Sequence, residues 1–473
     1  MVRPLSWPYF TTIFIIYEKS YKYFICYYDE FTMRILMIHP HTKSLLGREY
    51  YDNPSLFRKL IRKLVTSIDP RPLSLPILAA LTPEEHEIKM MEAAPDEIDY
   101  GEDFDLVAIS STTRFAPLAY EIADRFRREG VKVVLGGWHP SALPEEAKQH
   151  ADAVVIGEAE YTWPILLKDL ERKRLKPFYF QSRPTDPKDI PKPKNLFSDK
   201  VPLGIQATRG CPYRCEFCAV SHFPFRSIFR KRPLEVVMDE IRSLPQKEFL
   251  FYDNSLTIDP SYTKDLFRKM IEEKLDRKFI CFGNINVLGR DSELLRLSDE
   301  AGCVAWLVGL ESISQSSLEE VRKYTNIVKD YKHSIKMMHD HNLEIIASFV
   351  FGFDHDTPAT LYKTVDVIKE CEIDTPDIMI LTPLPGTPLF DRLDKEGRIL
   401  TRDWSRYTFE DVVFRPNQME PQELLDISKE VFKEVFSLSN MLRRFFGAIA
   451  RLSSDKFFDV LMRNIYYHER RYQ

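Results

Sequence analysis

Short apolar, β-rich runs alternate with amphipathic helical segments along most of this 473-residue chain. In the first part of the chain, these runs cover residues 34–38, 106–110, 131–137 and 153–157. Between the second and third runs, apolar side chains recur at helical spacing from Leu118 to Phe126, and arginines occupy the opposite face. Such alternation is typical of a parallel sheet built from βαβ units. The sequence therefore predicts an α/β domain over residues 33–185.

A proline-rich connector separates this region from a second series of the same kind. Four prolines between residues 184 and 193 are typical of a semi-rigid linker. Beyond the linker, six more strand-like runs alternate with helices, at residues 203–208, 248–252, 279–283, 304–310, 345–352 and 377–382. Six βα units are two short of a closed eight-fold barrel, in which the chemistry gathers at the carboxyl ends of the strands. Residues 186–400 are predicted to form a partial barrel.

The two ends of the chain differ from the rest. Residues 1–32 are rich in tyrosine and phenylalanine and precede the first strand, so we expect an extension that joins no core; the alternative is a segment on a membrane surface. Residues 401–473 are predicted to be helical. From Met441 to Gln473 seven Lys/Arg and three Asp/Glu alternate with apolar side chains. Such a tail contacts an anionic membrane or simply covers a domain.

Composition excludes several classes of protein. The net charge of −5 provides no field that would attract a nucleic-acid backbone, so no nucleic-acid partner is expected. Seven cysteines in 473 residues are too few for a disulfide scaffold. No stretch approaches the roughly 18 apolar residues that span a bilayer, and no signal peptide is evident. We expect a cytoplasmic protein, with peripheral membrane contact through the tail as the alternative.

Three cysteines stand close together directly after the first run of the second series. Cys211, Cys215 and Cys218 have the spacing C-x3-C-x2-C. Three thiolates in one short loop suit an iron–sulfur cluster, whereas a structural zinc site needs four ligands. A cluster held by three cysteines leaves one iron open. The alternative is a zinc site whose fourth ligand is His222, Cys281, Cys303 or Cys371.

This motif, with Phe217 before its last cysteine, resembles that of the radical S-adenosylmethionine enzymes. The segment VVLGGWHPSALPEEAKQHADAVVIGEAEYTWPILLKDL is similar to the cobalamin-binding domain of one large branch of that family. Three later segments, LVGLESISQSSLEEV, SFVFGFDHDT and LTPLPGTPLFDRLDKEGRI, resemble strands four to six of the same branch. The matches run from about residue 33 to residue 418. They imply an N-terminal Rossmann-like cobalamin domain, a partial (βα)6 barrel and a helical C-terminal tail.

The resemblance also implies cofactors and site residues. Cys211, Cys215 and Cys218 would hold a [4Fe–4S] cluster whose open iron chelates S-adenosylmethionine. The backbone near Phe217 would meet the adenine, and Asp253 and Asn254 would lie near the methionine amino group. The remaining residues expected in the cofactor cleft are Glu311, Ser312, Gly352 and Thr382. An external electron donor is required, and no catalytic residue is singled out.

Glycines at the strand ends of the first domain mark a place for cobalamin. Open α/β sheets bind ligands at the carboxyl ends of their strands, and glycine lets the backbone approach a flat macrocycle. The residues concerned are Gly136, Gly137, Gly157 and Glu158. The family's D-x-H-x-x-G loop has no match here, and the candidate histidines are His39, His41 and His139. We therefore expect cobalt without a protein imidazole ligand, or a vestigial domain.

These features predict a cobalamin-dependent radical enzyme that methylates an unactivated carbon of a lipid-like or other small substrate. Radical chemistry suits such a carbon because it offers no acidic proton to a general base. One alternative is formation of a carbon–carbon bond, or cyclisation of a lipid, without methyl transfer. A second alternative is an iron–sulfur electron carrier.

Overall fold

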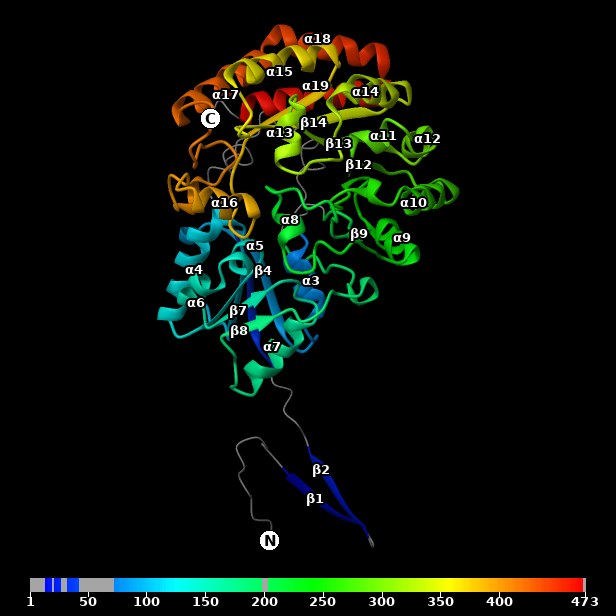
Figure 1. The fold of residues 1–473 in the computed structure, drawn as a ribbon. Helices are drawn as coiled ribbons and strands as arrows, with labels where there is room; N and C mark the ends of the chain where they lie inside the picture. The colour runs from blue at the N-terminus through cyan, green and yellow to red at the C-terminus, as the bar shows by residue number, and fades with distance from the viewer. Residues whose placement is uncertain (1–12, 19–20, 27–31, 42–71, 198–202, 471–473) are drawn as a thin grey trace.

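The computed structural model describes the chain except for residues 1–12, 19–20, 27–31, 42–71, 198–202 and 471–473. An N-terminal α/β unit lies below a larger second unit, and the C-terminal helices lie at the opposite end (Figure 1). In the extension, β1 (Ile13–Glu18) pairs with β2 (Tyr21–Cys26) in an antiparallel sheet of its own. The rest of the prediction for residues 1–32 falls largely outside the described residues.

The N-terminal unit is a six-stranded parallel sheet in the order β4-β3-β5-β6-β7-β8. Its strands are β3 (Arg34–Pro40), β4 (Glu87–Ala93), β5 (Leu106–Ser110), β6 (Lys132–Gly136), β7 (Ala153–Ile156) and β8 (Phe178–Phe180). The order reverses between β3 and β5, and such a switch point is where open α/β sheets bind ligands.

Helices cover both faces of this sheet, which explains why its central strands are apolar throughout. On one face pack α3 (Ser74–Leu81) and α7 (Thr162–Glu171); on the other pack α4 (Ala116–Arg128) and α6 (Pro144–His150). The short α5 (Trp138–Ala142) follows β6. The crossover helix predicted around Leu118 to Phe126 is α4. Sequence analysis did not identify β4 or β8, because β4 exposes charged side chains and β8 has three residues.

The second unit is built on five parallel strands in the order β11-β12-β13-β14-β15. These are β11 (Glu248–Leu250), β12 (Lys278–Gly283), β13 (Cys303–Glu311), β14 (Glu344–Phe351) and β15 (Thr375–Ile380). The first predicted run, residues 203–208, joins this sheet only through a parallel bridge between Ile205 and Phe251. It continues into β9 (Thr208–Arg209), which pairs antiparallel with β10 (Arg230–Lys231).

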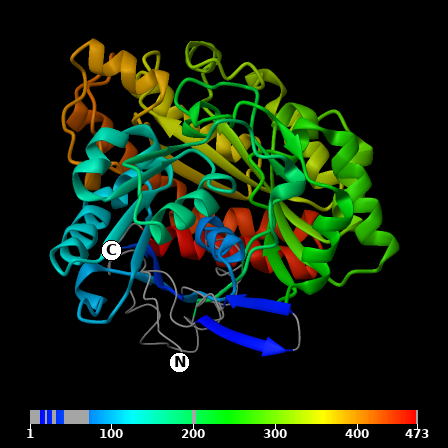
Figure 2. The same cartoon turned by 90° about the horizontal axis from the view of Figure 1, so that it is seen from below.

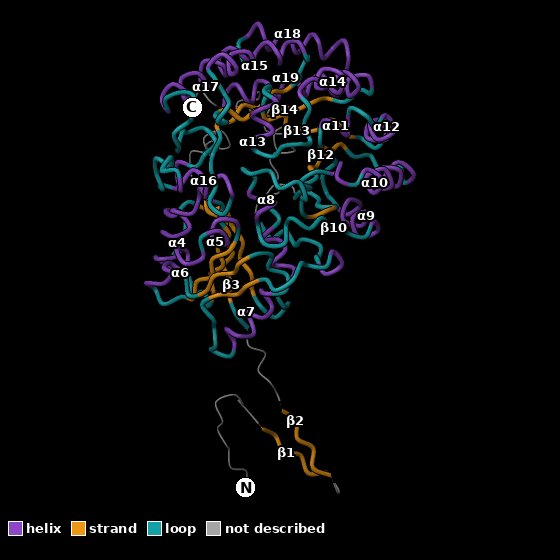
Figure 3. Tube along the Cα trace, viewed as in Figure 1, coloured by secondary structure: helices purple, strands orange, loops and turns teal. Residues whose placement is uncertain are grey.

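The outer layer of the barrel consists of helices that follow the strands (Figure 3). They are α9 (Leu234–Ser243), α10 (Pro260–Glu272), α11 (Ile285–Leu288), α12 (Ser292–Glu300), α13 (Gln315–Glu320), α14 (Tyr331–Asp340) and α15 (Pro358–Glu370). α16 (Pro388–Lys395) lies against the N-terminal unit, where Phe390 joins the core. α10 shows why they form: Asp259 caps the Tyr262 N–H, and Leu266 and Phe267 face the core. The curled sheet and its helices form the predicted partial barrel.

The C-terminal region contains three successive helices between residues 421 and 470. α17 (Pro421–Val435), α18 (Leu438–Arg451) and α19 (Ser454–Arg470) cross the molecule behind the N-terminal sheet in Figure 2. α19 is fastened by the buried pair of Arg463 and Glu344. Before these helices, the chain returns to the N-terminal unit, where Trp404 packs in its core and donates its indole N–H to Glu146 at 2.9 Å. Among the described residues no helix is long and apolar enough to cross a membrane.

Candidate active site

The three cysteines lie on a loop of residues 210–229, the cysteine loop, which leaves β9 and returns to β10. Gly210 begins it with φ +94°, and a Cβ there would collide with the Ile228 carbonyl. Cys211 then donates its backbone N–H to the Arg226 carbonyl at 2.7 Å. The cysteine loop is therefore folded back on itself, and the glycine before its first cysteine is required by that path.

The cysteine thiols suit a metal cluster. All three are free; Cys215 is buried, and Cys211 and Cys218 are half-buried. Burial raises the pKa of Cys211, and it raises the pKa of Cys215 to about 12, although nearby Lys323 acts in the opposite direction. Metal binding supplies the energy that converts such buried thiols to thiolates.

The arrangement fits a [4Fe–4S] cluster better than zinc. Within the described part of the chain, no three His, Cys, Asp or Glu side chains converge on a single ion. A cubane cluster takes one thiolate on each of three irons, so its ligands lie farther apart than those of one ion. His222 Nε2 lies 3.2 Å from the Cys215 carbonyl oxygen, and Cys281 and Cys303 are fully buried in the barrel core. Among the described residues, none of the four candidate fourth ligands, His222, Cys281, Cys303 and Cys371, joins the three cysteines in a group that could hold one ion.

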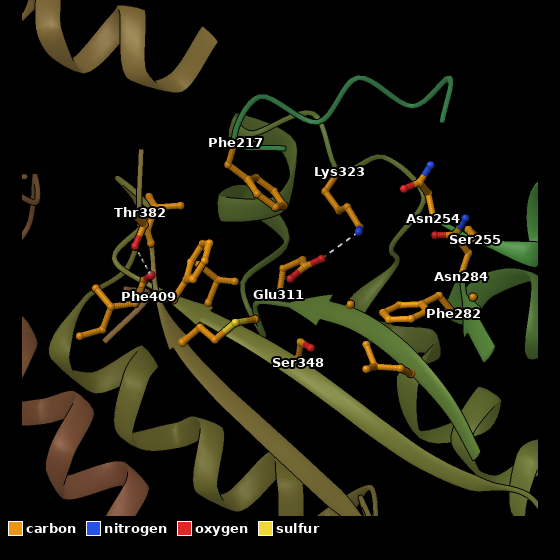
Figure 4. Close-up of a pocket in the computed structure, with 17 residues that line it drawn as sticks. Phe217, Asn254, Ser255, Phe282, Asn284, Glu311, Lys323, Ser348, Thr382 and Phe409 are labelled. Atoms are coloured by element: carbon orange, nitrogen blue, oxygen red, sulfur yellow. Dashed lines mark hydrogen bonds and ion pairs between the residues drawn. The ribbon is translucent and has the colours of Figure 1, made fainter. Parts of the chain in front are cut away.

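A pocket opens beside the cysteine loop at the carboxyl ends of the barrel strands (Figure 4). Four predicted site residues line it: Phe217, Asn254, Glu311 and Thr382. The other lining residues are Ser255, Phe282, Gly283, Asn284, Leu307, Gly309, Lys323, Ser348, Val350, Met379, Ile380, Leu381 and Phe409. The strand-end location is the one that the partial barrel predicted.

Asp253 lies behind this pocket and does not line it. Its carboxylate accepts hydrogen bonds from the backbone N–H of Ala207, at 3.1 Å, and from the N–H and hydroxyl of Thr208. Burial raises the pKa of Asp253 to about 6. Its contacts fix the strand that leads into the cysteine loop. The neighbouring Asn254 does line the pocket, and its buried Nδ2 has no hydrogen-bond partner among the described residues.

A buried ion pair forms one wall of the pocket. Glu311 ends β13 at a register shift, with φ +65°, and its Oε1 lies 2.9 Å from the Lys323 Nζ (Figure 4). Burial lowers the pKa of Lys323, but the adjacent Glu311 carboxylate outweighs this effect and raises it, so Lys323 remains an ammonium ion. Sequence analysis did not identify Lys323, because a single lysine beyond a strand end belongs to no motif.

The other expected cleft residues mainly shape the surrounding turns. Ser312 accepts the Ser314 N–H at 3.0 Å, and Thr382 donates to the Ile380 carbonyl at 3.2 Å. Gly352 has φ +111° and donates its N–H to Asp356 at 3.0 Å. These contacts hold the loops after β13, β14 and β15 in place around the pocket.

The carboxyl edge of the N-terminal sheet fits cobalamin. Gly137, directly after β6, has φ +100°, and a Cβ there would lie 2.7 Å from the Ser111 carbonyl oxygen. The Ser111 hydroxyl is buried and has no hydrogen-bond partner among the described residues. Gly136 has only ordinary contacts. A glycine-lined edge with an unused neutral donor suits the amide-bearing rim of a corrin.

The candidate histidines at this edge are engaged within the protein. His39 Nδ1 lies 3.0 Å from the Ser110 carbonyl oxygen, and His39 Nε2 lies 3.2 Å from the Ser74 hydroxyl. His139 is fully buried, with Nε2 3.1 Å from Glu146. A cobalt without a protein imidazole ligand stays a prediction.

Gly157 and Glu158 face the barrel. Gly157 has φ +93°, and a Cβ there would approach Gln181 and Pro224 of the cysteine loop. The Glu158 side chain is 1% exposed and contacts three arginines. Burial would raise the pKa of Glu158, but Arg230 and the two other arginines hold it well below its usual range.

Comparison with known protein families identifies both units. Residues 205–368 match the radical SAM superfamily, residues 63–167 match the B12 binding domain, and residues 387–465 match a domain of unknown function, DUF4070. The first two matches imply a [4Fe–4S] cluster, S-adenosylmethionine and cobalamin as cofactors. These are the three cofactors that the sequence predicted.

Curated relatives match over most of their length. The chain is 32% identical to bacteriochlorophyllide d C-8(2)-methyltransferase of Chlorobaculum tepidum, over 79% of this chain and 87% of the relative. It is 30% identical to the C-12(1)-methyltransferase of the same organism, over 80% of this chain and 85% of the relative. The hopanoid C-2 methylase of Rhodopseudomonas palustris is 26% identical, over 78% of this chain and 72% of the relative.

A solved structure confirms the fold class. The radical S-adenosylmethionine methyltransferase TsrM from Kitasatospora setae, with cobalamin and a [4Fe–4S] cluster bound, superposes with a TM-score of 0.67. The match covers 93% of this chain and 99% of that chain at 14% identity, so it shows the fold alone. With its Cys211, Cys215 and Cys218 loop at the barrel mouth and its glycine-lined N-terminal sheet, the chain belongs to the radical S-adenosylmethionine superfamily, in the branch that carries a B12-binding domain.

Proposed function

We propose that this enzyme transfers a methyl group to an unactivated carbon of a hydrophobic, polycyclic small molecule. One observation carries the proposal: beyond the Glu311–Lys323 pair, the pocket wall is mostly apolar, with Phe282, Leu307 and Phe409 among its residues. Such a wall favours a substrate with little polar surface. The bacteriochlorophyllide and hopanoid methyltransferases, whose names denote large ring systems, support this substrate class.

When bound, the cluster, S-adenosylmethionine and cobalamin supply the radical and methyl-transfer chemistry. The protein binds and orients these cofactors and excludes water from them. We propose that Cys211, Cys215 and Cys218 are the cluster ligands, and that Lys323 faces the carboxylate of S-adenosylmethionine. Glu311 keeps that ammonium charged and in place, and the unused Asn254 amide donates to the same ligand. The apolar wall keeps water from reactive species.

The N-terminal sheet edge is the proposed cobalamin site. Gly136, Gly137 and the Ser111 hydroxyl support it, since they combine close backbone approach with an unused donor. The proposed domain division is 1–32, 33–185, 186–400 and 401–473.

Labelled S-adenosylmethionine tests the reaction. The reconstituted enzyme is incubated anaerobically with deuterated methyl donor, a low-potential reductant and fractionated tetrapyrrole or lipid extracts. Mass analysis should show a hydrophobic product that has gained one labelled methyl group. A cyclised or coupled product without label would support carbon–carbon bond formation in place of methyl transfer. Reduction of an added electron acceptor without any modified small molecule would support the electron carrier.

We further propose that α18 contacts the lipid surface from which such a substrate is drawn. Leu438, Leu442, Phe446 and Ile449 recur at helical spacing, and all four side chains are exposed. The arginines of the tail contribute less than its sequence suggested. Arg444 is buried and donates to Asn464, and Arg451 pairs with Asp374.

A further inference from the structure

The base of the cysteine loop is held by a carboxylate from the N-terminal unit. Arg209 and Arg230 stand opposite each other where β9 and β10 pair, so they close the loop at its two ends. Both side chains reach Glu158, which lies between β7 and α7. Arg230 donates from Nη1 and Nη2 to the two carboxylate oxygens, each at 2.7 Å, and Arg209 Nη1 lies 3.7 Å from Oε1.

A third arginine connects the same carboxylate to the first cysteine. Arg226 Nε lies 2.7 Å from Glu158 Oε1. The backbone carbonyl of Arg226 accepts the Cys211 N–H at 2.7 Å. Glu158 therefore contacts both the base of the cysteine loop and the residue that fixes the start of the motif.

Burial increases the free-energy cost of breaking these ion pairs. The side chains of Arg209 and Arg230 are 2% and 8% exposed. Arg209 also pairs with Glu160 at 2.5 Å. The three arginines are therefore balanced by two carboxylates, Glu158 and Glu160. Removing the charge of Glu158 would leave cations uncompensated in a buried environment, which is far more costly than losing a surface pair.

The backbone of the N-terminal unit also lies close to the cysteine loop at this contact. A side chain at Gly157 would approach Pro224 at 3.3 Å, so the cysteine loop and the N-terminal unit touch through backbone and proline ring. Trp138, which follows Gly137 at the proposed cobalamin edge, packs on Phe223 with ring centroids 4.4 Å apart. The edge of the N-terminal sheet and the cysteine loop are thus in direct contact.

We infer that Glu158 is a positioning residue that fixes the cysteine loop against the cobalamin edge of the N-terminal unit. Through Arg230, Arg226 and Arg209 it sets where the three cysteines stand relative to that edge. The inference rests on the proposed function only in its second consequence, the coupling of radical formation to methyl transfer; the first consequence concerns the loop alone.

The first test uses amide hydrogen exchange on the full-length protein without cofactors. Glu158→Gln keeps the shape and removes the charge. The control, Glu240→Gln, removes an equally buried carboxylate that pairs with Arg232 inside the barrel. Exchange in peptides covering residues 209–230 should rise about tenfold or more in Glu158→Gln, because local opening no longer breaks the buried pairs. It should stay at the wild-type rate in the control.

An unchanged rate in Glu158→Gln, or an equal rise in both variants, would overturn the inference. Arg226→Gln provides a second variant, since it removes one contact from a side chain that is 16% exposed. It should raise exchange in the same peptides by a smaller factor. If Glu158→Gln does not accumulate as folded protein, the exchange rate of Arg226→Gln tests the inference in its place.

The second test uses the cofactor-loaded enzyme and the ratio of 5′-deoxyadenosine to methylated product. Glu158→Gln should raise this ratio several-fold, Glu158→Asp should restore part of the loss, and Glu240→Gln should leave the ratio unchanged. A ratio unchanged in Glu158→Gln would contradict the coupling. If the wild type methylates nothing, the proposed function fails, and the exchange experiment still judges the positioning role.

Discussion

The two parallel sheets end in edges of different chemistry. At the N-terminal sheet the edge carries backbone glycines and neutral groups, including Gly136, Gly137 and the Ser111 hydroxyl. At the barrel the edge carries a buried ion pair between Glu311 and Lys323. One fold principle, that ligands bind at strand ends, thus produces two sites with different electrostatics.

The difference supports the proposed assignment of one cofactor to each edge. A neutral edge has no charged side chain that would lose its hydration when a ligand binds. A large, flat, uncharged ring can therefore lie against it. A buried ammonium ion selects a ligand with a carboxylate, because that partner completes its hydrogen bonds. Cobalamin and S-adenosylmethionine match these two descriptions in turn. Variants confined to one edge should therefore impair one cofactor and spare the other.

The largest effect is expected from replacing Cys211, Cys215 and Cys218 together by alanine. Without thiolates no cluster can bind, so the visible iron–sulfur absorption and formation of 5′-deoxyadenosine should both disappear. Cobalamin titration of the same variant should still give a complex, because the N-terminal edge is unchanged. Residual 5′-deoxyadenosine from the triple variant would contradict the assignment of the cluster ligands.

The second effect concerns the charged edge alone. Lys323→Met removes a charge-assisted contact worth about 1.5–3 kcal/mol, so the Kd for S-adenosylmethionine should rise about tenfold to a hundredfold. Iron content and cobalamin binding should not change. The matched control is Lys329→Met, since that lysine does not line the pocket. Equal weakening in both variants would remove Lys323 from the site.

The third effect concerns the neutral edge alone. Gly137→Ala places a Cβ against the Ser111 backbone at a positive φ. Strain of about 1–3 kcal/mol and the displaced edge should lower cobalamin affinity several-fold while leaving 5′-deoxyadenosine formation intact. Gly130→Ala is a matched control, because Gly130 has φ +84° and a Cβ added there would meet no atom within 4 Å. Loss of cobalamin in both variants would indicate general destabilisation.

The smallest effect is expected far from both edges. Replacing Leu442 and Phe446 of α18 by serine should weaken sedimentation with anionic vesicles a few-fold, since each buried apolar side chain contributes about 1.5–3 kcal/mol at most. Both cofactor titrations should be unchanged. A wild-type protein that remains in the supernatant at low salt would exclude the proposed lipid contact.

The sequence predicted the framework of both edges. The runs at residues 106–110 and 304–310 correspond to β5 and β13. The cysteine spacing marked the loop that is proposed to bind the cluster. These features are local: a period of apolar residues, or three thiols in eight positions. Lys323 is different, because its role depends on Glu311, twelve positions earlier, which only the fold brings within 2.9 Å.

The same reasoning explains the placement of Glu158 and Asp253. Both are acidic residues at strand ends, where a ligand contact is the natural expectation. In the structure Glu158 accepts hydrogen bonds from Arg230, 72 positions away, and Asp253 accepts one from Thr208, 45 positions earlier. A sequence pattern shows that a carboxylate ends a strand, but not whether the chain itself supplies its partner.

Trp404 has a consequence for the order in which the protein forms. The last strand of the N-terminal sheet ends at Phe180, yet the core of that unit is completed by Trp404, which arrives roughly 220 residues later. At about 5–20 residues per second of synthesis, the first unit waits tens of seconds on the ribosome with part of its apolar surface uncovered. The proposed cobalamin edge of the first unit thus reaches its final support only once the barrel has also been made.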